Sequence, residues 1–400
     1  MSSSLATRPR PARVSPAVFA AAGYFLPRLL FLHTRWAPQV HFGDIAWALD
    51  GFPEDDLDLG SARFWAEWRR RWVSRGEHHL AVATGSTTVA GQARAHRAAA
   101  ACFHWAEFMD FDDAAAKAAL RRRVRDAFER SLECGDLDIT QREVAAGGPG
   151  SAVVRYWLLR PPAAASTPGP LPCVVVCNGL DSVTEVEPLS LAEAFLERGI
   201  AAVLFEGPGQ GLQVGQTPLP ADPERVVARL VTELHGEPGV DAGRLAFLGV
   251  SFGGHIALRV AQRLGGAFRC VVNLSGGPRM APYAGLPRRL KDDFSFVLSG
   301  GRTDLSPAAV QELFDRLEVD GRDPATTDVL SVHGALDDIF PLVDLQRLHA
   351  AWGDRAQLLV HEREAHVCLN QLDSCLLTAA DWVSQRLAPP TSAPSTGRIS

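Results

Sequence analysis

The first third of the chain carries apolar residues at the spacing of an amphipathic helix. Aromatic side chains recur at this spacing between residues 64 and 72, and again between residues 103 and 111 after a run rich in alanine. Residues 117–132 combine charged and apolar positions with the same period. No stretch between about residues 44 and 137 alternates apolar and polar positions with the period of two that a half-buried strand shows. This part of the chain is therefore predicted to be all-helical.

The pattern changes near residue 140. Short, continuous apolar runs then alternate with amphipathic segments of helical length. Runs of this kind are typical of strands buried on both faces, so they predict a mostly parallel sheet with helices on both faces. Strands are expected at residues 153–159, 174–177, 201–205, 245–250, 271–274, 329–333 and 357–361, and helices at residues 189–198, 225–235, 253–264, 307–317, 342–352 and 375–387.

These patterns divide the chain into four parts. Residues 1–40 form an N-terminal arm, and residues 41–145 form a helical domain. Residues 146–388 form an α/β domain, and residues 389–400 are a Pro-, Ser- and Thr-rich tail that is expected to be disordered. A length of 400 residues suits one large domain with a smaller accessory domain.

The N-terminal arm has the outline of a signal peptide, since Arg8, Arg10 and Arg13 precede an apolar run over residues 14–26. Two prolines interrupt or end that run, a further arginine follows it, and no clean cleavage site comes after it. These features favour a frayed arm followed by a short packing helix, with export as the alternative. No stretch approaches the ~18 apolar residues that a membrane-spanning helix needs.

Composition narrows the class of protein. The chain has 40 Lys and Arg residues against 46 Asp and Glu residues, whereas a nucleic-acid-binding protein normally carries a concentrated basic face. The hydrophobic fraction of 46% can supply a sizeable core and excludes a wholly disordered or fibrous chain. The seven cysteines are odd in number and lie mostly inside apolar runs, as in a reduced cytoplasmic protein. Cys173 and Cys177 would lie apart on a strand, and no second pair of ligands follows, so no metal site is expected.

The sharpest chemical signal is the sequence Gly-Val-Ser-Phe-Gly at residues 249–253. An apolar strand precedes it and an amphipathic helix follows it, and in that setting G-x-S-x-G is a nucleophile elbow. The glycines two positions either side of Ser251 leave room for a strained turn that exposes the serine side chain. The helix that begins there aims its positive end and its free N–H groups at an oxygen on which negative charge develops.

A serine nucleophile needs a base, and the base needs a carboxylate that orients it. Both should follow the serine along the chain, each after a later strand. One expected strand runs into Asp337 and Asp338, and the next one ends at His361 and leads to His366. His366 is preferred as the base because it lies in the loop, whereas His361 closes the strand.

The sequence around the acid resembles that of the α/β-hydrolases, whose acid loop reads roughly H-G-x-x-D-x-x-x-P. This chain has His333, Gly334, Asp337 and Pro341 at those positions. The resemblance implies that Asp337 is the acid and that Asp338 is its solvated neighbour. It also implies an α/β-hydrolase fold, with a mostly parallel sheet and helices on both faces.

The same resemblance implies an oxyanion hole. Its donors would be the N–H groups of Phe252, next to the nucleophile, and of Leu180, in the loop after an early strand where Gly179 lets the backbone approach closely. A further hallmark is the sequence Phe-Glu-Gly-Pro-Gly-Gln-Gly at residues 205–211, which matches the family's turn D-x-P-G-x-G with Glu206 in place of Asp. This turn fits neither the dinucleotide fingerprint nor the P-loop, so no nucleotide cofactor is expected.

Residues 178–185, the turn after the next strand and the helical domain make the chain similar to the FrsA-like, DUF1100-type group of α/β-hydrolases. The resemblance covers about residues 153–387 and implies that the N-terminal all-helical domain caps the active site and that the protein dimerises. Several members of the group cleave a C–C bond beside a ketone. Asp181 and Glu185 are the candidate substrate-binding residues. Asp181 could instead cap the helix that follows, and this chain departs from its relatives next to Glu185, with Val-Thr-Glu where they often carry Thr-Lys-Glu.

Three functions are compatible with these observations. The first is a serine hydrolase that cleaves a C–C bond next to a ketone in an aromatic or polyketide-like substrate. The second is a carboxylesterase, thioesterase or acyl transferase that uses the same triad on a natural product or a small ester. The third is a ligand-binding protein that has lost catalysis, which the presence of all three triad residues disfavours. For the two enzymes we expect a small-molecule carbonyl substrate and a cytoplasmic homodimer, with no metal, cofactor, nucleic acid or membrane partner.

Overall fold

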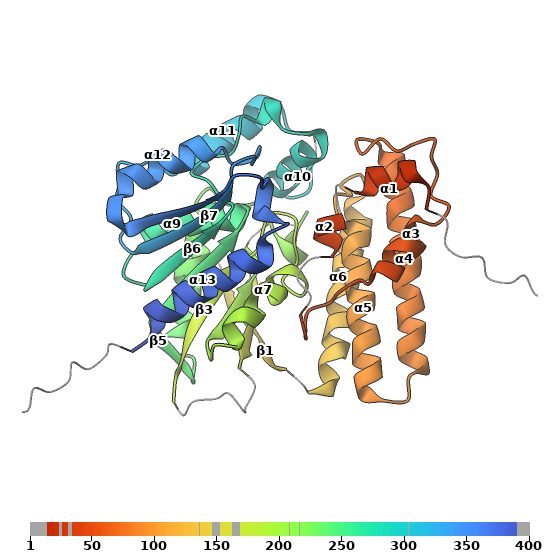
Figure 1. The fold of residues 1–400 in the computed structure, drawn as a ribbon, viewed down its shortest axis with the longest axis horizontal. Coiled ribbons are helices and arrows are strands. Elements are labelled where there is room, and N and C mark those ends of the chain that lie inside the picture. Colours follow the sequence, from red (N-terminus) through yellow and green to blue (C-terminus); the bar gives the residue numbers. More distant parts are fainter. Residues whose placement is uncertain are drawn as a thin grey trace, which may run out of the picture.

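The computed structural model describes residues 14–23, 26–30, 34–135, 137–145, 153–161, 169–207, 209–215, 217–302 and 304–389. A sheet covered by helices lies beside a bundle of long helices (Figure 1). The basic segment that suggested a signal peptide lies outside the described residues, and so does the predicted tail beyond residue 389.

Within the described residues, one eight-stranded sheet has the order β1-β2-β4-β3-β5-β6-β7-β8. β2 pairs antiparallel with both β1 and β4, and the remaining pairs are parallel. Every residue of β4 and β6 is buried, which explains why these strands read as continuous apolar runs. The strands are β1 (Asp138–Ala145), β2 (Val153–Arg160), β3 (Leu171–Cys177), β4 (Ala201–Phe205), β5 (Val240–Val250), β6 (Cys270–Leu274), β7 (Asp328–Gly334) and β8 (Ala356–His361).

β1 is a strand that the sequence pattern does not predict. Most of its side chains are exposed or half-buried, and only Val144 is buried, so no apolar run marks it. It pairs with β2 along its whole length, from Asp138 opposite Arg160 to Ala145 opposite Val153. The sheet therefore begins at residue 138, inside the range that the sequence pattern assigned to the helical domain.

The bundle that precedes the sheet is helical, which confirms the prediction for this part of the chain. Trp65, Trp68 and Trp72 of α4 are buried, and Gly76 of the same helix leaves room for a ring from α5. A Cβ atom at Gly76 would lie 2.3 Å from the ring of Phe103, so glycine permits this close approach. The helices are α1 (Pro16–Ala22), α2 (Leu26–Leu29), α3 (Phe42–Leu49), α4 (Ala62–Gly85), α5 (Val89–Glu107) and α6 (Ala114–Ser131), followed by the 3-10 turn η1 (Leu132–Cys134).

Helices cover both faces of the sheet and bury two hydrophobic cores. The core under α7 and α13 also contains the apolar residues of the bundle, and Phe128 of α6 packs edge-on against Trp157 of β2 with ring centroids 5.7 Å apart. The core on the other face contains residues of α8, α9, α10, α11 and α12. These helices are α7 (Glu187–Leu196), α8 (Glu224–Leu234), α9 (Phe252–Arg263), α10 (Arg288–Ser299), α11 (Pro307–Leu317), α12 (Leu342–Trp352) and α13 (Leu372–Leu387), and the 3-10 turns are η3 (Gly211–Gln213), η4 (Tyr283–Gly285), η5 (Gly353–Arg355) and η6 (His366–Cys368).

α10 is a helix that the sequence pattern does not predict. It packs against the bundle, since the Arg289 guanidinium lies 2.9 Å from the Asp112 carboxylate and the rings of Phe111 and Phe296 are 5.6 Å apart. None of the helices in the described ranges is long and apolar enough to span a membrane.

Candidate active site

Ser251 sits at a sharp turn between β5 and α9. Its backbone has φ 57° and ψ −119°, a conformation that non-glycine residues rarely adopt. A Cβ atom at Gly249 would lie 1.9 Å from the carbonyl oxygen of Gly253, and a Cβ atom at Gly253 would lie 2.4 Å from that of Cys177. Both positions therefore require glycine, and the packed turn presents the serine side chain at the carboxyl end of the sheet.

The structure brings Ser251, His366 and Asp337 together. The Nε2 atom of His366 lies 2.8 Å from the Oγ atom of Ser251, and its Nδ1 atom lies 2.8 Å from Oδ2 of Asp337. The N–H groups of Ile339 and Phe340 donate to Oδ1 of Asp337 over 2.9 Å each. These contacts form a continuous chain from the hydroxyl to a buried carboxylate.

The carboxyl group of Asp337 is held ionised. Burial by itself would raise its pKa, but the neighbouring His366 ring and the hydrogen bonds from His366 and Phe340 lower the pKa below its usual value. An ionised carboxylate beside Nδ1 orients the imidazole and stabilises its positively charged form.

The two alternatives from the sequence lie elsewhere. The side chain of Asp338 is exposed, while that of Asp337 is fully buried. The Nε2 atom of His361 lies 3.3 Å from the Sγ atom of Cys375 in α13. Neither Asp338 nor His361 contacts Ser251.

Phe252 and Leu180, the expected donors of the oxyanion hole, lie in the turn of Ser251 and in the loop that approaches it. Phe252 is the first residue of α9, and Leu180 follows Gly179 in the loop after β3. A Cβ atom at Gly179 would lie 3.4 Å from Cβ of Ser251, which shows how closely this loop approaches the nucleophile. Among the described residues, neither N–H group has a hydrogen-bond acceptor. Both N–H groups are therefore unoccupied by other groups of the described chain.

The turn after β4 supports this loop. The Nε2 atom of Gln210 donates to the carbonyl oxygen of Gly179 over 2.9 Å. The carboxylate of Glu206 accepts hydrogen bonds from the Thr184 hydroxyl over 3.0 Å and from the Leu212 N–H over 2.9 Å. The sequence identifies this turn as structural, but no sequence signal marks Gln210 as a residue that holds the loop after β3.

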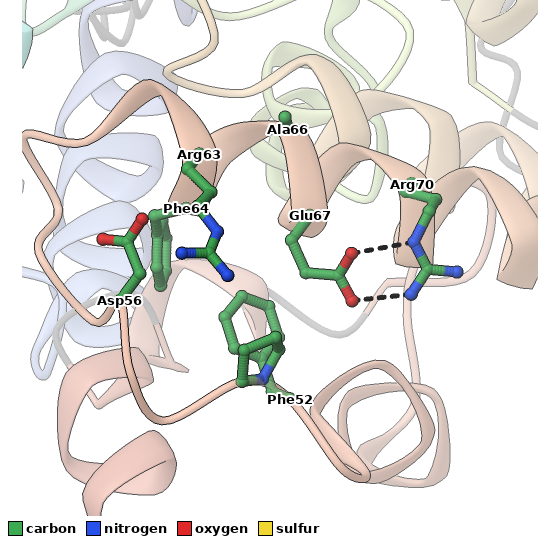
Figure 2. A pocket seen from close by; sticks show the side chains of 8 residues that line it. Phe52, Asp56, Arg63, Phe64, Ala66, Glu67 and Arg70 are labelled. Carbon is green, nitrogen blue, oxygen red and sulfur yellow. Dashed lines mark hydrogen bonds and ion pairs between the residues drawn. The ribbon is translucent and has the colours of Figure 1, made fainter.

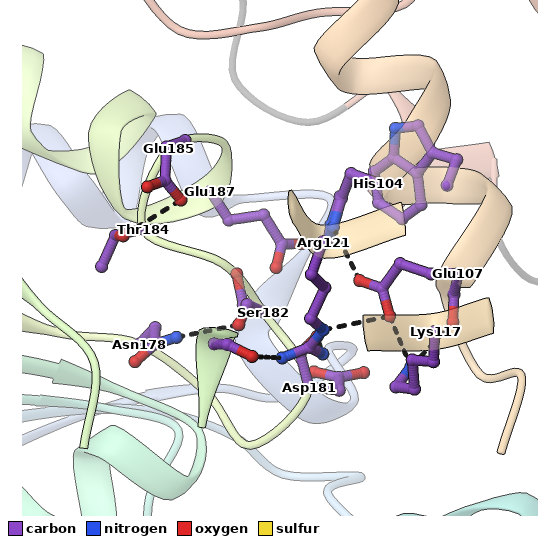
Figure 3. Close-up of polar contacts among 12 residues, drawn as sticks. His104, Glu107, Lys117, Arg121, Asn178, Asp181, Ser182, Thr184, Glu185 and Glu187 are labelled. Carbon is purple, nitrogen blue, oxygen red and sulfur yellow. Dashed lines mark hydrogen bonds and ion pairs between the residues drawn. The ribbon is translucent and has the colours of Figure 1, made fainter. Parts of the chain in front are cut away.

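The bundle also reaches the loop after β3, through Arg121 of α6 (Figure 3). Its Nη2 atom donates to the carbonyl oxygen of Asp181 over 2.9 Å, and Nη1 donates to that of Gly211 over 2.7 Å. Its Nε atom lies 3.2 Å from the carboxylate of Glu107, which also binds Lys117. A buried cation of the bundle thus holds the residue that follows Leu180.

Asp181, one of the two predicted substrate-binding residues, forms an ion pair with an arginine of α2. Its carboxylate lies 2.9 Å from the guanidinium of Arg28, which also binds Glu187 over 2.7 Å. Asp181 does not cap α7, because the residue at the N-cap is Val186 and no side-chain cap is present.

Glu185, the other predicted substrate-binding residue, is buried in a similar arrangement. The Oε1 atom of Glu185 accepts hydrogen bonds from Arg125 over 2.7 Å and from the indole N–H of Trp157 over 2.9 Å. Both carboxylates therefore join the bundle or the N-terminal helices to the sheet.

A pocket on the surface of the bundle lies apart from these residues (Figure 2). It is lined by residues of α4 and of the preceding segment, among them Phe52, Arg63 and Glu67. The carboxylate of Glu67 is engaged by Arg70 and Arg71. The pocket contains none of the residues around Ser251. In the ranges that the structure describes, no group of three or more His, Cys, Asp or Glu side chains is arranged to hold a metal ion.

Comparisons with known proteins agree with this architecture. A family model described as "Esterase FrsA-like" matches residues 64–279, more than half of the chain. 2,6-Dihydropseudooxynicotine hydrolase of Paenarthrobacter nicotinovorans is 25% identical over 324 residues, which are 79% of this chain and 83% of that protein. 20-Hydroxy-prefusarin hydrolase FUS2 of Gibberella moniliformis is 31% identical over 206 residues, which are 48% of each chain.

One solved structure has the same arrangement of sheet and helices. The crystal structure of 2,6-dihydroxy-pseudo-oxynicotine hydrolase matches with a TM-score of 0.74 at 20% identity, over 87% of this chain and 93% of that one. At this level of identity the similarity shows the fold, an α/β-hydrolase sheet preceded by a helical region.

Proposed function

Because this chain belongs to the FrsA-like esterase family of α/β-hydrolases, we propose that it is a serine hydrolase with Ser251 as nucleophile, His366 as base and Asp337 as orienting acid. The observation that carries the proposal is the pair of 2.8 Å contacts that run from the serine hydroxyl through the imidazole to the buried carboxylate. Further support comes from the strained backbone of Ser251, which a structural serine would not require.

The proposed reaction begins when His366 takes the proton of Ser251 and Oγ attacks a carbonyl carbon of the substrate. The N–H groups of Phe252 and Leu180 donate hydrogen bonds to the oxygen that becomes negatively charged. When the tetrahedral intermediate collapses, His366 returns the proton to the leaving group. Water activated by His366 then releases the acyl group as a carboxylic acid.

We propose that the leaving group is carbon, so that the enzyme cleaves a C–C bond next to a ketone in an aromatic or polyketide-like substrate. A carbon leaving group departs only if its negative charge is delocalised, which requires a ketone or a phenol beside the cleaved bond. The resemblance to a group with C–C hydrolases supports this substrate class, as do relatives named as hydrolases of 2,6-dihydropseudooxynicotine and 20-hydroxy-prefusarin.

The second candidate is a carboxylesterase, thioesterase or acyl transferase with the same triad. The description of the matching family as esterases favours it. A β-diketone and a simple ester of similar size separate the two candidates, because both present a carbonyl to Ser251 and only the ester has an oxygen leaving group.

Labelling with a fluorophosphonate probe tests the nucleophile and its partners. We expect wild type to be labelled, Ser251→Ala to show no labelling, and His366→Ala and Asp337→Asn to be labelled at least ~100-fold more slowly because the serine is no longer activated. Asp338→Asn is the matched control, since it changes the adjacent, exposed carboxylate. A folded wild-type protein that resists the probe, or a labelled Ser251→Ala variant, would contradict the assignment.

We also propose that the helical part of residues 41–145, which ends before β1, acts as a cap over the site and that the protein is a homodimer, as the family resemblance implies. The cysteine pattern supports a cytoplasmic location. Sedimentation velocity at micromolar concentration should give a species of twice the mass of the chain. A protein that sediments as a single chain over that range would contradict the dimer.

A further inference from the structure

Asp293 of α10 is a buried carboxyl group without a hydrogen-bond partner on one oxygen. The residue is 1% exposed, and its Oδ1 atom has no partner within the described part of the chain. Native proteins pair nearly all buried polar atoms, because an unpaired one loses its hydration without compensation. An unpaired buried carboxyl group therefore suggests a binding partner other than the protein itself.

The charged groups that face Asp293 come from three other parts of the fold. They are Asp181 in the loop after β3, Lys117 and Arg121 of α6, and Arg28 of α2. The cations among them already have partners. Arg28 binds Asp181 and Glu187, while Lys117 and Arg121 both bind Glu107. Burial, and next the negative charge of Asp181, raise the pKa of Asp293 well above its usual value, which favours the protonated carboxyl group.

α10 also packs against the residue that follows Ser251. The ring of Phe294 lies 6.4 Å from the ring of Phe252, the residue after the nucleophile. Arg121, one of the cations that face Asp293, holds the carbonyl oxygen of Asp181, next to Leu180. Asp293 thus lies where α10, the loop after β3 and the bundle meet. The buried atoms Asn178 Oδ1 and Ser182 Oγ, in the same loop, also have no partner among the described residues.

We propose that Asp293 binds the second carbonyl oxygen of a β-dicarbonyl substrate, the oxygen that belongs to the carbon leaving group. This inference rests on the proposed function and names the part of the substrate that the site recognises. A carboxyl group that keeps its proton donates a hydrogen bond to a ketone oxygen, and it donates a stronger one to an enolate.

The step that Asp293 assists is the breaking of the C–C bond. Oγ of Ser251 forms a bond to the attacked carbonyl carbon, and the proton of the serine goes to His366. Collapse breaks the bond to the carbon between the two carbonyls, and its electron pair moves onto the second carbonyl oxygen as an enolate. His366 then protonates the enolate carbon, which gives a methyl or methylene ketone, and water hydrolyses the acyl-enzyme to the acid. Asp293 donates a hydrogen bond throughout and keeps its own proton.

The test compares Asp293→Leu and Asp293→Asn with wild type on two substrates that carry the same acyl group, an aryl β-diketone and an aryl ester. Only the diketone develops an enolate oxygen. We expect Asp293→Leu to lower kcat for the diketone about 100-fold, the usual effect of removing one donor to a developing charge, and to change kcat for the ester less than about threefold. Asp293→Asn keeps a donor, so its kcat for the diketone should fall by less than about tenfold.

A pH profile adds a readout that a purely structural role would not affect. In wild type, kcat for the diketone should fall as the pH rises through the raised pKa of Asp293, because the carboxylate repels the enolate. Asp293→Asn should lose this alkaline limb, and the ester profile should lack it in both proteins. Fluorophosphonate labelling and the melting temperature show whether each variant is folded with a working serine.

Equal losses on both substrates, or an unchanged diketone rate in Asp293→Leu, would overturn the proposal. A wild-type enzyme that is labelled at Ser251 but leaves the diketone intact also overturns it, while the serine hydrolase assignment stands. The absence of labelling at Ser251 would instead contradict the proposed function itself.

Discussion

Arg121 connects the bundle to the nucleophile by holding the backbone beside it. Its guanidinium is buried and donates to two carbonyl oxygens, one in the loop after β3 and one in the turn after β4. A planar group with five donors can satisfy both carbonyls and a carboxylate at once, which a lysine cannot do. Arg122, its neighbour in the chain, is exposed. Arg121 is therefore one of the side chains that hold the loop containing Leu180, together with Gln210.

We expect Arg121→Lys to lower kcat for ester hydrolysis about 10- to 100-fold with little change in KM. A displaced oxyanion donor stabilises the transition state less well, whereas it contributes little to the binding of the substrate. Steady-state kinetics on a chromogenic ester would measure this effect. Arg122→Lys provides the matched control, and its kcat should equal that of wild type. A wild-type kcat in Arg121→Lys would show that the loop holds its position without the arginine.

The chemistry around Ser251 could be predicted from sequence only where a residue carries a local signature. Ser251 lies in a five-residue motif, and the candidate acid and base each follow a strand that the pattern predicts. Arg121 is one of three consecutive arginines, and no local feature tells which of them points inward. Nothing in the sequence links Asp181 to its arginine partner, which is 153 residues away along the chain. Such pairings depend on the tertiary fold.

At the scale of elements, α6 joins the bundle to the sheet with two buried arginines one turn apart. Arg121 binds the loop, and Arg125 binds Glu185, whose other hydrogen-bond donors include Trp157 of β2. Residues four apart lie on the same face of a helix, so this face of α6 is committed to the sheet. Glu185 is buried, and its pKa stays low in spite of burial because of Arg125 and Trp157.

Removal of Arg125 should leave a buried carboxylate without its cation. We expect Arg125→Leu to lower the free energy of unfolding by about 3–5 kcal/mol, and the double variant Arg125→Leu/Glu185→Leu to recover most of that loss, because the buried charge is then gone. Urea denaturation of wild type, both single variants and the double variant would measure the coupling. Additive losses would show that the two side chains act independently.

Two elements escaped prediction for different physical reasons. β1 is an edge strand with one buried side chain, so it lacks the apolar run that marked the central strands. Five of the first six residues of α10 are charged, and its apolar residues are concentrated in its second half. The helices and strands with one long apolar face were predicted because burial imposes a regular period. β1 is instead held by its hydrogen-bonded pairing with β2, and α10 packs against the bundle, so neither needed a long apolar face.

At the scale of the whole molecule, ion pairs fix the N-terminal helices against the loop that follows β3. Arg28 of α2 binds both Asp181 and Glu187. Burial would raise the pKa of each carboxyl group, but the charge of Arg28 lowers the pKa of both below the usual value. A carboxyl group with a lowered pKa contributes stability that is fully present above the unfolded value, near 4, and is lost as the pH falls through the folded value.

The melting temperature should therefore fall steeply as the pH is lowered from about 5 to about 3. Arg28→Met should melt at a lower temperature near neutral pH and show a shallower fall in acid, because its two carboxylates no longer prefer the charged form. Arg302→Met is the control, since Arg302 pairs with the exposed Asp304 on the surface. Circular dichroism melts at several pH values would measure both slopes. Parallel curves for wild type and Arg28→Met would contradict the role of these ion pairs.

The bundle shares its hydrophobic core with α13, a helix that is synthesised much later, and this affects folding during translation. The bundle is translated first, but part of the apolar surface that completes its core comes from α7 and from Leu372–Leu387. A growing chain therefore exposes hydrophobic surface through most of translation, when chaperones have access to it. His366 follows Ser251 by 115 residues along the chain, so the proposed nucleophile would lack its base until this later segment has been synthesised.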